Sequence, residues 1–138
     1  MFAPLLRQLN RPCQARRIKG KSCFSATIDT RLYHYAVVRS DLSLGTICAQ
    51  LVHAVGESCQ GPVPSGTYAV VLAVKNEDEL LRVHAGLEKA GIRCVLIREP
   101  DAPFLNQAMA VGVTPCERLK VKKVLGRLPL LKETICAY

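Results

Sequence analysis

The strongest constraint on the fold is an alternation of short apolar runs with helical patterns. Residues 32–39, LYHYAVVR, predict a strand, and residues 44–58 repeat apolar side chains at helical spacing. The same order returns in residues 67–74, which predict a second strand, and in a helix expected between a cap at Asn76 and a stop at Gly91. Strands separated by helices of this length pair in parallel through right-handed crossovers, so the sequence predicts an α/β fold.

The second half of the chain adds two strands and a closing helix. Residues 92–98 predict a third strand, and residues 106–113 predict a fourth, weaker one. The short link between them is too brief for a parallel crossover, so we expect the fourth strand to run antiparallel. Thr114 and Pro115 are typical of an N-cap and a first helical position, which predicts a last helix ending near Gly126.

Composition limits the chain to one small domain with no membrane or metal chemistry. Half of the 138 residues are apolar, yet no run approaches the roughly 20 apolar residues that span a bilayer. The seven cysteines are far apart and form no CxxC pair, so we expect reduced, mostly buried thiols and no metal site; they are Cys13, Cys23, Cys48, Cys59, Cys94, Cys116 and Cys136. We expect the folded domain to occupy residues 32–130, followed by a tail of residues 131–138.

The net charge of +8 is concentrated at the N-terminus. Residues 1–31 hold seven of the 19 Lys and Arg but one of the 11 Asp and Glu, which leaves twelve basic and ten acidic residues for the rest. This segment is rich in arginine and poor in acids, as mitochondrial transit peptides are, although Pro4 and Pro12 interrupt a helix there. Residues 1–31 are therefore either a transit-like segment or a disordered basic arm, and in both cases they lie outside the predicted fold.

The first predicted helix carries an apolar and a polar stripe. We expect its apolar stripe to face the core through Leu44, Ile47, Cys48, Leu51 and Val55. Thr46, Gln50, His53 and Glu57 fall within roughly 60° of one another on the opposite side. This polar stripe has two interpretations. It is a site for a polar ligand, whose anionic group the first-turn N–H groups would favour, or it is an ordinary solvent face.

Three stretches resemble the type 2 peptidyl-tRNA hydrolase family of archaea and eukaryotes. Residues 35–54, YAVVRSDLSLGTICAQLVHA, contain a strand end similar to the family's V-R-x-D-L and a helix similar to its A-Q-x-x-H-A. The stretch AVVLAVKNEDELLRVHAGLEKAGIRCVLIRE is similar to the family's second strand, capped helix and third strand. The stretch AVGVTPCERLKVKKVLGRLPLLK is similar to its last strand and closing helix, so the resemblance covers residues 33–132.

The resemblance implies both a fold and a reaction. The fold would be a three-layer α/β/α sandwich around a mixed four-stranded sheet. The reaction would be hydrolysis of the ester between a peptide and the terminal ribose of tRNA. It needs a positioned water, a proton shuttle and a donor to the developing oxyanion. No metal and no cofactor are implied.

The chain departs from the family pattern at the residues that the family uses for catalysis. The family carries G-K-G-K at the corner before its first helix, whereas no lysine occurs here between Arg39 and Lys75. The family's third strand continues into Q-D-A-G-R-T, but this chain reads REPDAP, which keeps an acid and has no threonine. A second family threonine is replaced near Met109. The chain therefore resembles a divergent branch of the family.

Two hypotheses follow from the matches and the departures. In the first, the chain is a peptidyl-tRNA hydrolase in which Asp101 or Glu99 positions the water and Gln50 or Thr46 donates to the oxyanion. His53 would shuttle a proton, since its unperturbed pKa is near neutrality, with a structural role as the alternative. In the second, the chain is a non-catalytic RNA- or protein-binding module on the same fold.

The partner expected in either case is tRNA. Candidate phosphate contacts are Arg39, Arg98, Lys120, Lys122 and Lys123, of which the three lysines belong to the closing helix. A charged solvent face explains the same lysines equally well. The chain is expected to be either a monomer or a homodimer, and no membrane contact is expected. Its compartment is either the cytoplasm or the mitochondrion.

Overall fold

The computed structural model describes residues 29–132 of the chain. The expected N-terminal tail up to residue 28 and the C-terminal tail from residue 133 lie outside these residues. The elements, in chain order, are β1 (Leu32–Arg39), α1 (Leu44–Ser58), β2 (Tyr68–Val74), α2 (Glu77–Lys89), β3 (Cys94–Glu99), β4 (Gln107–Glu117) and α3 (Arg118–Leu125). In this part of the chain no helix is long and apolar enough to cross a membrane.

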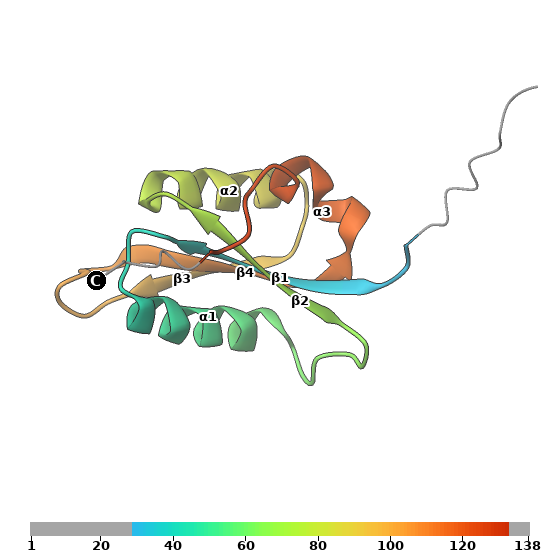
Figure 1. Cartoon of the computed structure of the whole chain (residues 1–138), viewed down its shortest axis with the longest axis horizontal. Helices are drawn as coiled ribbons and strands as arrows, with labels where there is room; N and C mark the ends of the chain where they lie inside the picture. The colour runs from blue at the N-terminus through green and yellow to red at the C-terminus, as the bar shows by residue number, and fades with distance from the viewer. Residues whose placement is uncertain (1–28, 133–138) are drawn as a thin grey trace, which may run out of the picture.

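The four strands form one mixed sheet in the order β2-β1-β4-β3. β1 and β2 are parallel, whereas β4 lies between β1 and β3 and is antiparallel to both. Helix α1 covers one face of the sheet, and α2 and α3 cover the other (Figure 1). The α/β fold, the three layers and the antiparallel fourth strand are therefore confirmed.

Side chains that alternate along the strands make a separate core on each face. Val37 belongs to the larger core under α2 and α3, together with Leu80, Leu87 and Val121. Its neighbour Val38 points to the other face, where a smaller core contains Ile47, Ala54, Ile97 and Ala110. This alternation is the period-two pattern of a strand that is buried on both faces.

Helix α1 has the predicted bounds but faces the sheet with a different side. Its buried residues are Ile47, Gln50, Ala54 and Ser58, whereas Leu44, Val52 and Val55 are among the exposed large apolar residues. The expectation that Gln50 lies opposite the core is wrong. The physical reason is close packing, because a Cβ atom at Gly112 on β4 would lie 2.0 Å from the Ala54 carbonyl oxygen. Helix α1 therefore packs on the sheet with the side that carries Ala54. The two polar residues on that side, Gln50 and Ser58, each form a side-chain hydrogen bond.

Strand β4 is longer than expected and includes the residues predicted to start the last helix. The expectation that Thr114 caps that helix is wrong, since β4 runs to Glu117 and α3 begins at Arg118. Two residues, Thr114 and Pro115, oppose only His34 of β1, which makes a β-bulge. A bulge removes the need for a ladder hydrogen bond, so proline is accommodated inside the strand.

The segment after α3 returns to the sheet. The Ala73 N–H of β2 donates to the Pro129 carbonyl, and the Leu131 N–H donates to the Val71 carbonyl. Leu130 forms an isolated antiparallel bridge with Leu72 between these bonds. Part of the exposed edge of β2 is therefore covered by the chain itself.

Candidate functional site

Two of the predicted site residues, Gln50 and Glu99, meet at the end of the sheet where β1 and β3 finish. The Gln50 amide nitrogen donates to the Glu99 carboxylate at 2.8 Å and joins α1 to the end of β3. Gln50 lies in the second turn of α1 and is 3% exposed. The first turn of α1 and the β3–β4 loop lie at this same end of the sheet, at the left of Figure 1.

The Gln50 side chain is only half satisfied. Its Oε1 atom is buried and has no hydrogen-bond partner among the described residues. Because an unpaired buried acceptor costs free energy, native proteins rarely keep one without a water, a ligand or a functional reason. The contact with the Glu99 carboxylate sets the orientation, since only the NH₂ group can donate to it. The remaining oxygen is thus an acceptor held in place for a donor.

The start of α1 offers backbone donors beside this pair. Ser43 is the N-cap, and its hydroxyl accepts from the Thr46 N–H at 3.3 Å and lies 2.8 Å from the Thr46 hydroxyl. The N–H groups of Leu44 and Gly45 precede the first possible helical acceptor, so the helix leaves them unpaired. A Cβ at Gly45 would meet nothing within 4 Å, which means that the surface there is open. This corner is suited to an anionic oxygen.

A buried arginine braces the same end of the sheet. Arg39 is 8% exposed and donates to both carboxylate oxygens of Asp41, at 3.0 and 2.8 Å. It also donates to the Gln107 side chain at 3.0 Å and to the Ala108 carbonyl at 3.1 Å. Glu77 of α2 completes the network by accepting from the Ala108 N–H at 2.8 Å. The hydrogen bonds from Arg39 lower the pKa of Asp41, so this carboxylate stays ionised.

Comparison with known proteins decides the family. The family described as Peptidyl-tRNA hydrolase PTH2 matches residues 32–131, which is most of the chain and includes every element of the fold. The chain belongs to this family.

Curated relatives from methanogenic archaea agree with this assignment. A peptidyl-tRNA hydrolase of Methanopyrus kandleri is 30% identical over 70% of this chain and 95% of its own length. A peptidyl-tRNA hydrolase of Methanococcus vannielii is 33% identical over 72% of this chain and 100% of its own length. A solved structure of a protein of unknown function from Agrobacterium covers 73% of this chain and 98% of that chain. Its TM-score is 0.47 and its sequence identity to this chain is 16%.

The structure separates the other predicted site residues of this PTH2 member. The His53 side chain is 62% exposed, and its Nδ1 lies 3.9 Å from a carboxylate oxygen of Glu57, whereas Gln50 is buried. Asp101 is exposed in the β3–β4 loop, where its backbone carbonyl accepts from the Phe104 and Leu105 N–H groups. Arg98 is exposed and donates to the Asn106 carbonyl at 2.9 Å.

The basic residues expected to contact RNA fall into two groups. Lys120, Lys122 and Lys123 are all exposed on α3, which stands away from the Gln50–Glu99 pair at the other end of the molecule (Figure 1). Arg39, in contrast, is buried and uses its donors inside the protein. Its guanidinium group is therefore already occupied by contacts within the protein.

The sequence analysis missed several residues of the site. Ser43 was detectable, since serine three residues before Thr46 at a helix start is an N-cap signal. The Arg39–Asp41 pair was also detectable in part, because a charged residue that ends an apolar strand needs a partner nearby. Glu77 and Gln107 had no such signal, since they reach the site only through the packing of α2 and the register of β4.

Proposed function

We propose that this PTH2 member hydrolyses the ester that joins a peptide to the terminal ribose of tRNA. One observation carries the proposal: the partly buried hydrogen bond between Gln50 and Glu99, beside the open start of α1. This arrangement supports three groups at one end of the sheet: the carboxylate of Glu99, the acceptor oxygen of Gln50 and the backbone N–H donors at the start of α1. These are the groups that ester hydrolysis needs.

In this proposal Glu99 is the general base. Its carboxylate removes a proton from a water molecule while the water oxygen bonds to the ester carbonyl carbon. The carboxylic acid so formed returns the proton to the ribose oxygen when the bond between that oxygen and the carbonyl carbon breaks. Gln50 is the positioning residue, because its NH₂ group holds one carboxylate oxygen of Glu99. Asp101 is the alternative base, since it follows Glu99 on the adjoining loop.

The oxyanion of the tetrahedral intermediate would lie against the first turn of α1. The N–H groups of Leu44 and Gly45 are oriented along the helix axis, and the helix dipole adds a partial positive charge there. Removing one oxyanion donor typically costs about 10²–10³-fold in kcat. This chain has no lysine at that corner, so we expect the backbone to carry the stabilisation. His53 points to solvent and has no role in this scheme.

Replacing the two candidate acids separately tests the proposal. Glu99→Gln keeps the size of the side chain and an oxygen that accepts from Gln50, but it removes the base. We expect it to lower kcat for N-acetyl-aminoacyl-tRNA by about 10²–10⁴-fold. Asp101→Asn is the matched control, and we expect it to change kcat less than threefold. The reverse order of effects would make Asp101 the base, and an unchanged kcat in both variants would refute the scheme.

A second function is favoured by the composition of the α1 corner. The family's corner lysine is missing, and Arg39, the nearest upstream cation, is buried and paired with Asp41. A chain without a cation at the corner would act as a non-catalytic module that binds RNA or a protein. Wild-type protein that binds deacylated tRNA but releases no peptide, even at high enzyme concentration, would establish this alternative.

The compartment and the oligomeric state are further parts of the proposal. The basic composition of residues 1–31 supports import into the mitochondrion. If this segment instead stays attached as a basic arm, the protein belongs in the cytoplasm. Imaging of the chain tagged at its C-terminus, with and without residues 1–28, distinguishes the two. Sedimentation at micromolar concentration decides between a monomer and a homodimer.

A further inference from the structure

Helix α1 exposes an apolar side to solvent. Among the helices and strands within residues 29–132, none lies over the side of α1 that faces away from the sheet (Figure 1). Leu44 and Val52 on α1 are 71% and 73% exposed. We call the exposed residues of this helix the outer face of α1; they are Leu44, Gly45, Cys48, Ala49, Val52, His53, Val55, Gly56 and Glu57. Two of these nine residues, His53 and Glu57, are polar.

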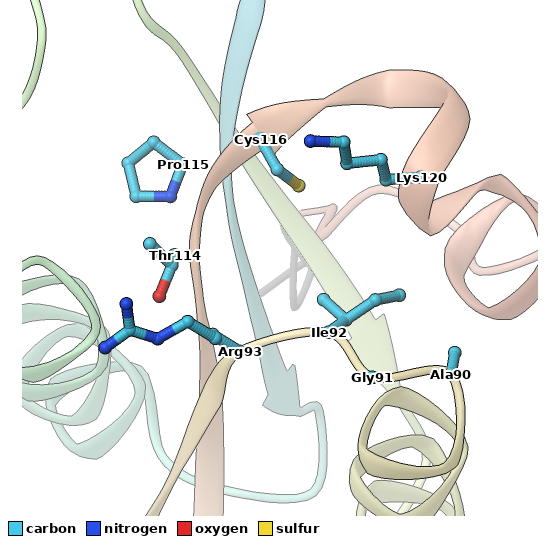
Figure 2. A pocket seen from close by; sticks show the side chains of 8 residues that line it. All are labelled: Ala90, Gly91, Ile92, Arg93, Thr114, Pro115, Cys116 and Lys120. Carbon is cyan, nitrogen blue, oxygen red and sulfur yellow. The ribbon is translucent and has the colours of Figure 1, made fainter.

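The other two helices carry charge where α1 carries apolar side chains. Four of the five exposed residues of α2 and four of the five of α3 are charged, against one of nine on α1. Figure 2 shows one of these cations, Lys120, extending from α3 at the rim of the pocket that it lines. A surface helix normally keeps a charged outer face, and a helix that is apolar all round is buried. The outer face of α1 therefore fits a partner molecule. The charged residues compared are Asp78, Arg82, Glu88 and Lys89 on α2 and Arg118, Lys120, Lys122 and Lys123 on α3.

The outer face of α1 is self-complementary in an antiparallel arrangement. The row that lies opposite Ala54 consists of Gly45, Ala49, Val52 and Gly56. Their spacings are four, three and four residues, so the row reads the same from either end. About a two-fold axis, Gly45 of one copy lies opposite Gly56 of the other, and Ala49 lies opposite Val52 in the same way. The larger apolar residues of the outer face lie on one flank of this row, and the same axis places that flank against its own copy.

The charged residue of the outer face favours the antiparallel orientation. Glu57 lies in the last turn of α1, where the helix dipole disfavours an acid, and α1 has no basic residue in that turn. Its ion-pair contact is with His53, at 3.9 Å. In an antiparallel pair Glu57 lies beside the first turn of the second copy, which has no acid and whose Leu44 and Gly45 N–H groups have no helical acceptor. In a parallel pair both Glu57 carboxylates would stay at the ends where the dipoles disfavour them.

We propose that two copies of this chain associate through their α1 outer faces, with the helices antiparallel about a two-fold axis. The occupant of the face is a second copy, because the row of small residues and the position of Glu57 both match under that symmetry. Helix α1 has 15 residues and is about 22 Å long. A contact one helix wide lies at the low end of the roughly 1,200–2,000 Å² that stable interfaces bury, so the dimer should dissociate at micromolar concentrations.

The pairing also regulates the start of α1, and this part of the inference rests on the proposed function. Glu57 of the second copy lies at the first turn, where the N–H groups of Leu44 and Gly45 would stabilise the oxyanion. The dimer and the substrate therefore compete for one corner. The monomer is the form that hydrolyses the ester.

Sedimentation velocity of the full chain from about 1 to 300 µM tests the interface. The interface variant is Val52→Glu, which puts an acid from each copy at the centre of the contact. The control is Leu119→Glu on α3, the same kind of change at a residue that is 59% exposed. We expect Val52→Glu to raise the dimer Kd at least tenfold and Leu119→Glu to change it less than twofold. Equal effects would overturn the proposal, and so would a wild-type chain that stays monomeric, because the face would then belong to a different protein or to residues 1–28.

Reversing the charge of Glu57 tests the orientation. Glu57→Lys places a cation at the end of α1 where its own dipole favours it, so the free energy of unfolding should stay the same or rise. The same lysine lies beside the positive first turn of the second copy, so we expect the dimer Kd to rise at least fivefold. Glu57→Gln should give an intermediate Kd. An unchanged or lower Kd in Glu57→Lys would refute the antiparallel pairing, and urea unfolding shows that each variant is folded.

The dependence of activity on protein concentration tests the competition. At a fixed concentration of N-acetyl-aminoacyl-tRNA, turnover per chain should fall in the wild type as the protein concentration rises through the dimer Kd. It should stay constant in Val52→Glu. Constant turnover in a wild type that dimerises would contradict the contact at the start of α1. If neither protein hydrolyses the ester, the proposed function fails, and sedimentation alone decides the dimer.

Discussion

Replacing Gly112 by alanine should destabilise the protein more than any other single methyl addition at a glycine of the described chain. The added Cβ would lie 2.0 Å from the Ala54 carbonyl oxygen and 2.8 Å from the Ser58 hydroxyl. To lengthen the distance from this Cβ to the Ala54 oxygen even to 3.0 Å, helix α1 must move away from β4 by about 1 Å. The two α1 atoms in contact cannot yield easily, because one is backbone and the other belongs to the buried Ser58. Overpacking of this kind costs about 1–3 kcal/mol and occasionally more, and we expect about 3 kcal/mol.

The matched control is Gly56→Ala in the interior of α1. A Cβ there meets nothing within 4 Å, and alanine has a higher helix propensity than glycine by about 1 kcal/mol. The same chemical change should therefore stabilise the protein by about 0.5–1 kcal/mol. Urea unfolding followed by circular dichroism measures both variants. For a domain of this size the predicted loss in Gly112→Ala corresponds to a fall in Tm of roughly 10–20 °C.

The outcome for Gly112→Ala also bears on the site. Because Gln50 lies one turn before Ala54, an outward shift of α1 would lengthen the bond from Gln50 to Glu99. We expect hydrolase activity to fall in the fraction that remains folded. If the free energy of unfolding of Gly112→Ala is within 0.5 kcal/mol of the wild-type value, α1 does not pack closely on β4. Burial of the α1 side that carries Gln50 and Ser58 would then be refuted.

Two titratable groups, His34 and Asp41, should make the free energy of unfolding depend on pH. Burial lowers the pKa of His34, whose Nε2 lies 2.8 Å from the Ser58 hydroxyl. Because the unfolded state then binds the proton more readily, the free energy of unfolding should decrease as the pH falls from 7 through 6.5 toward 5. This dependence should weaken in His34→Gln but not in the exposed-site control His53→Gln, as measured by urea titrations at each pH. Asp41, whose pKa Arg39 lowers, contributes stability above pH 3.8 that is lost as the pH falls through its folded pKa. Asp41→Asn should cost about 1–2 kcal/mol at pH 7, an effect reduced by the partial exposure of the carboxylate, and less at pH 3.

Local sequence signals were sufficient for most of the elements. The bounds of β1 and α1 agree with the prediction to the residue, and the caps of α2 at Asn76 and Gly91 were found from their residue types. These features depend on residues a few positions apart: the apolar period, the amide carbonyl oxygen of Asn76 as a capping acceptor, and a glycine with positive φ. The resemblance to the PTH2 family then supplied the layers around the sheet.

Tertiary packing decided which side of α1 is buried and where β4 ends. Apolar periodicity favoured a face containing Leu44 and Val55, but the missing side chain of Gly112 admits Ala54, and Glu99 and His34 supply partners for Gln50 and Ser58. Thr114 and Pro115 carry a helix-start signal, yet pairing with β1 holds them in a bulge. In both cases the deciding atoms come from strands more than 20 residues away in the chain, which no local pattern contains. The sequence alone therefore determined the order of the elements and indicated the family, and the tertiary structure decided where β4 ends and which polar residues of α1 reach the site.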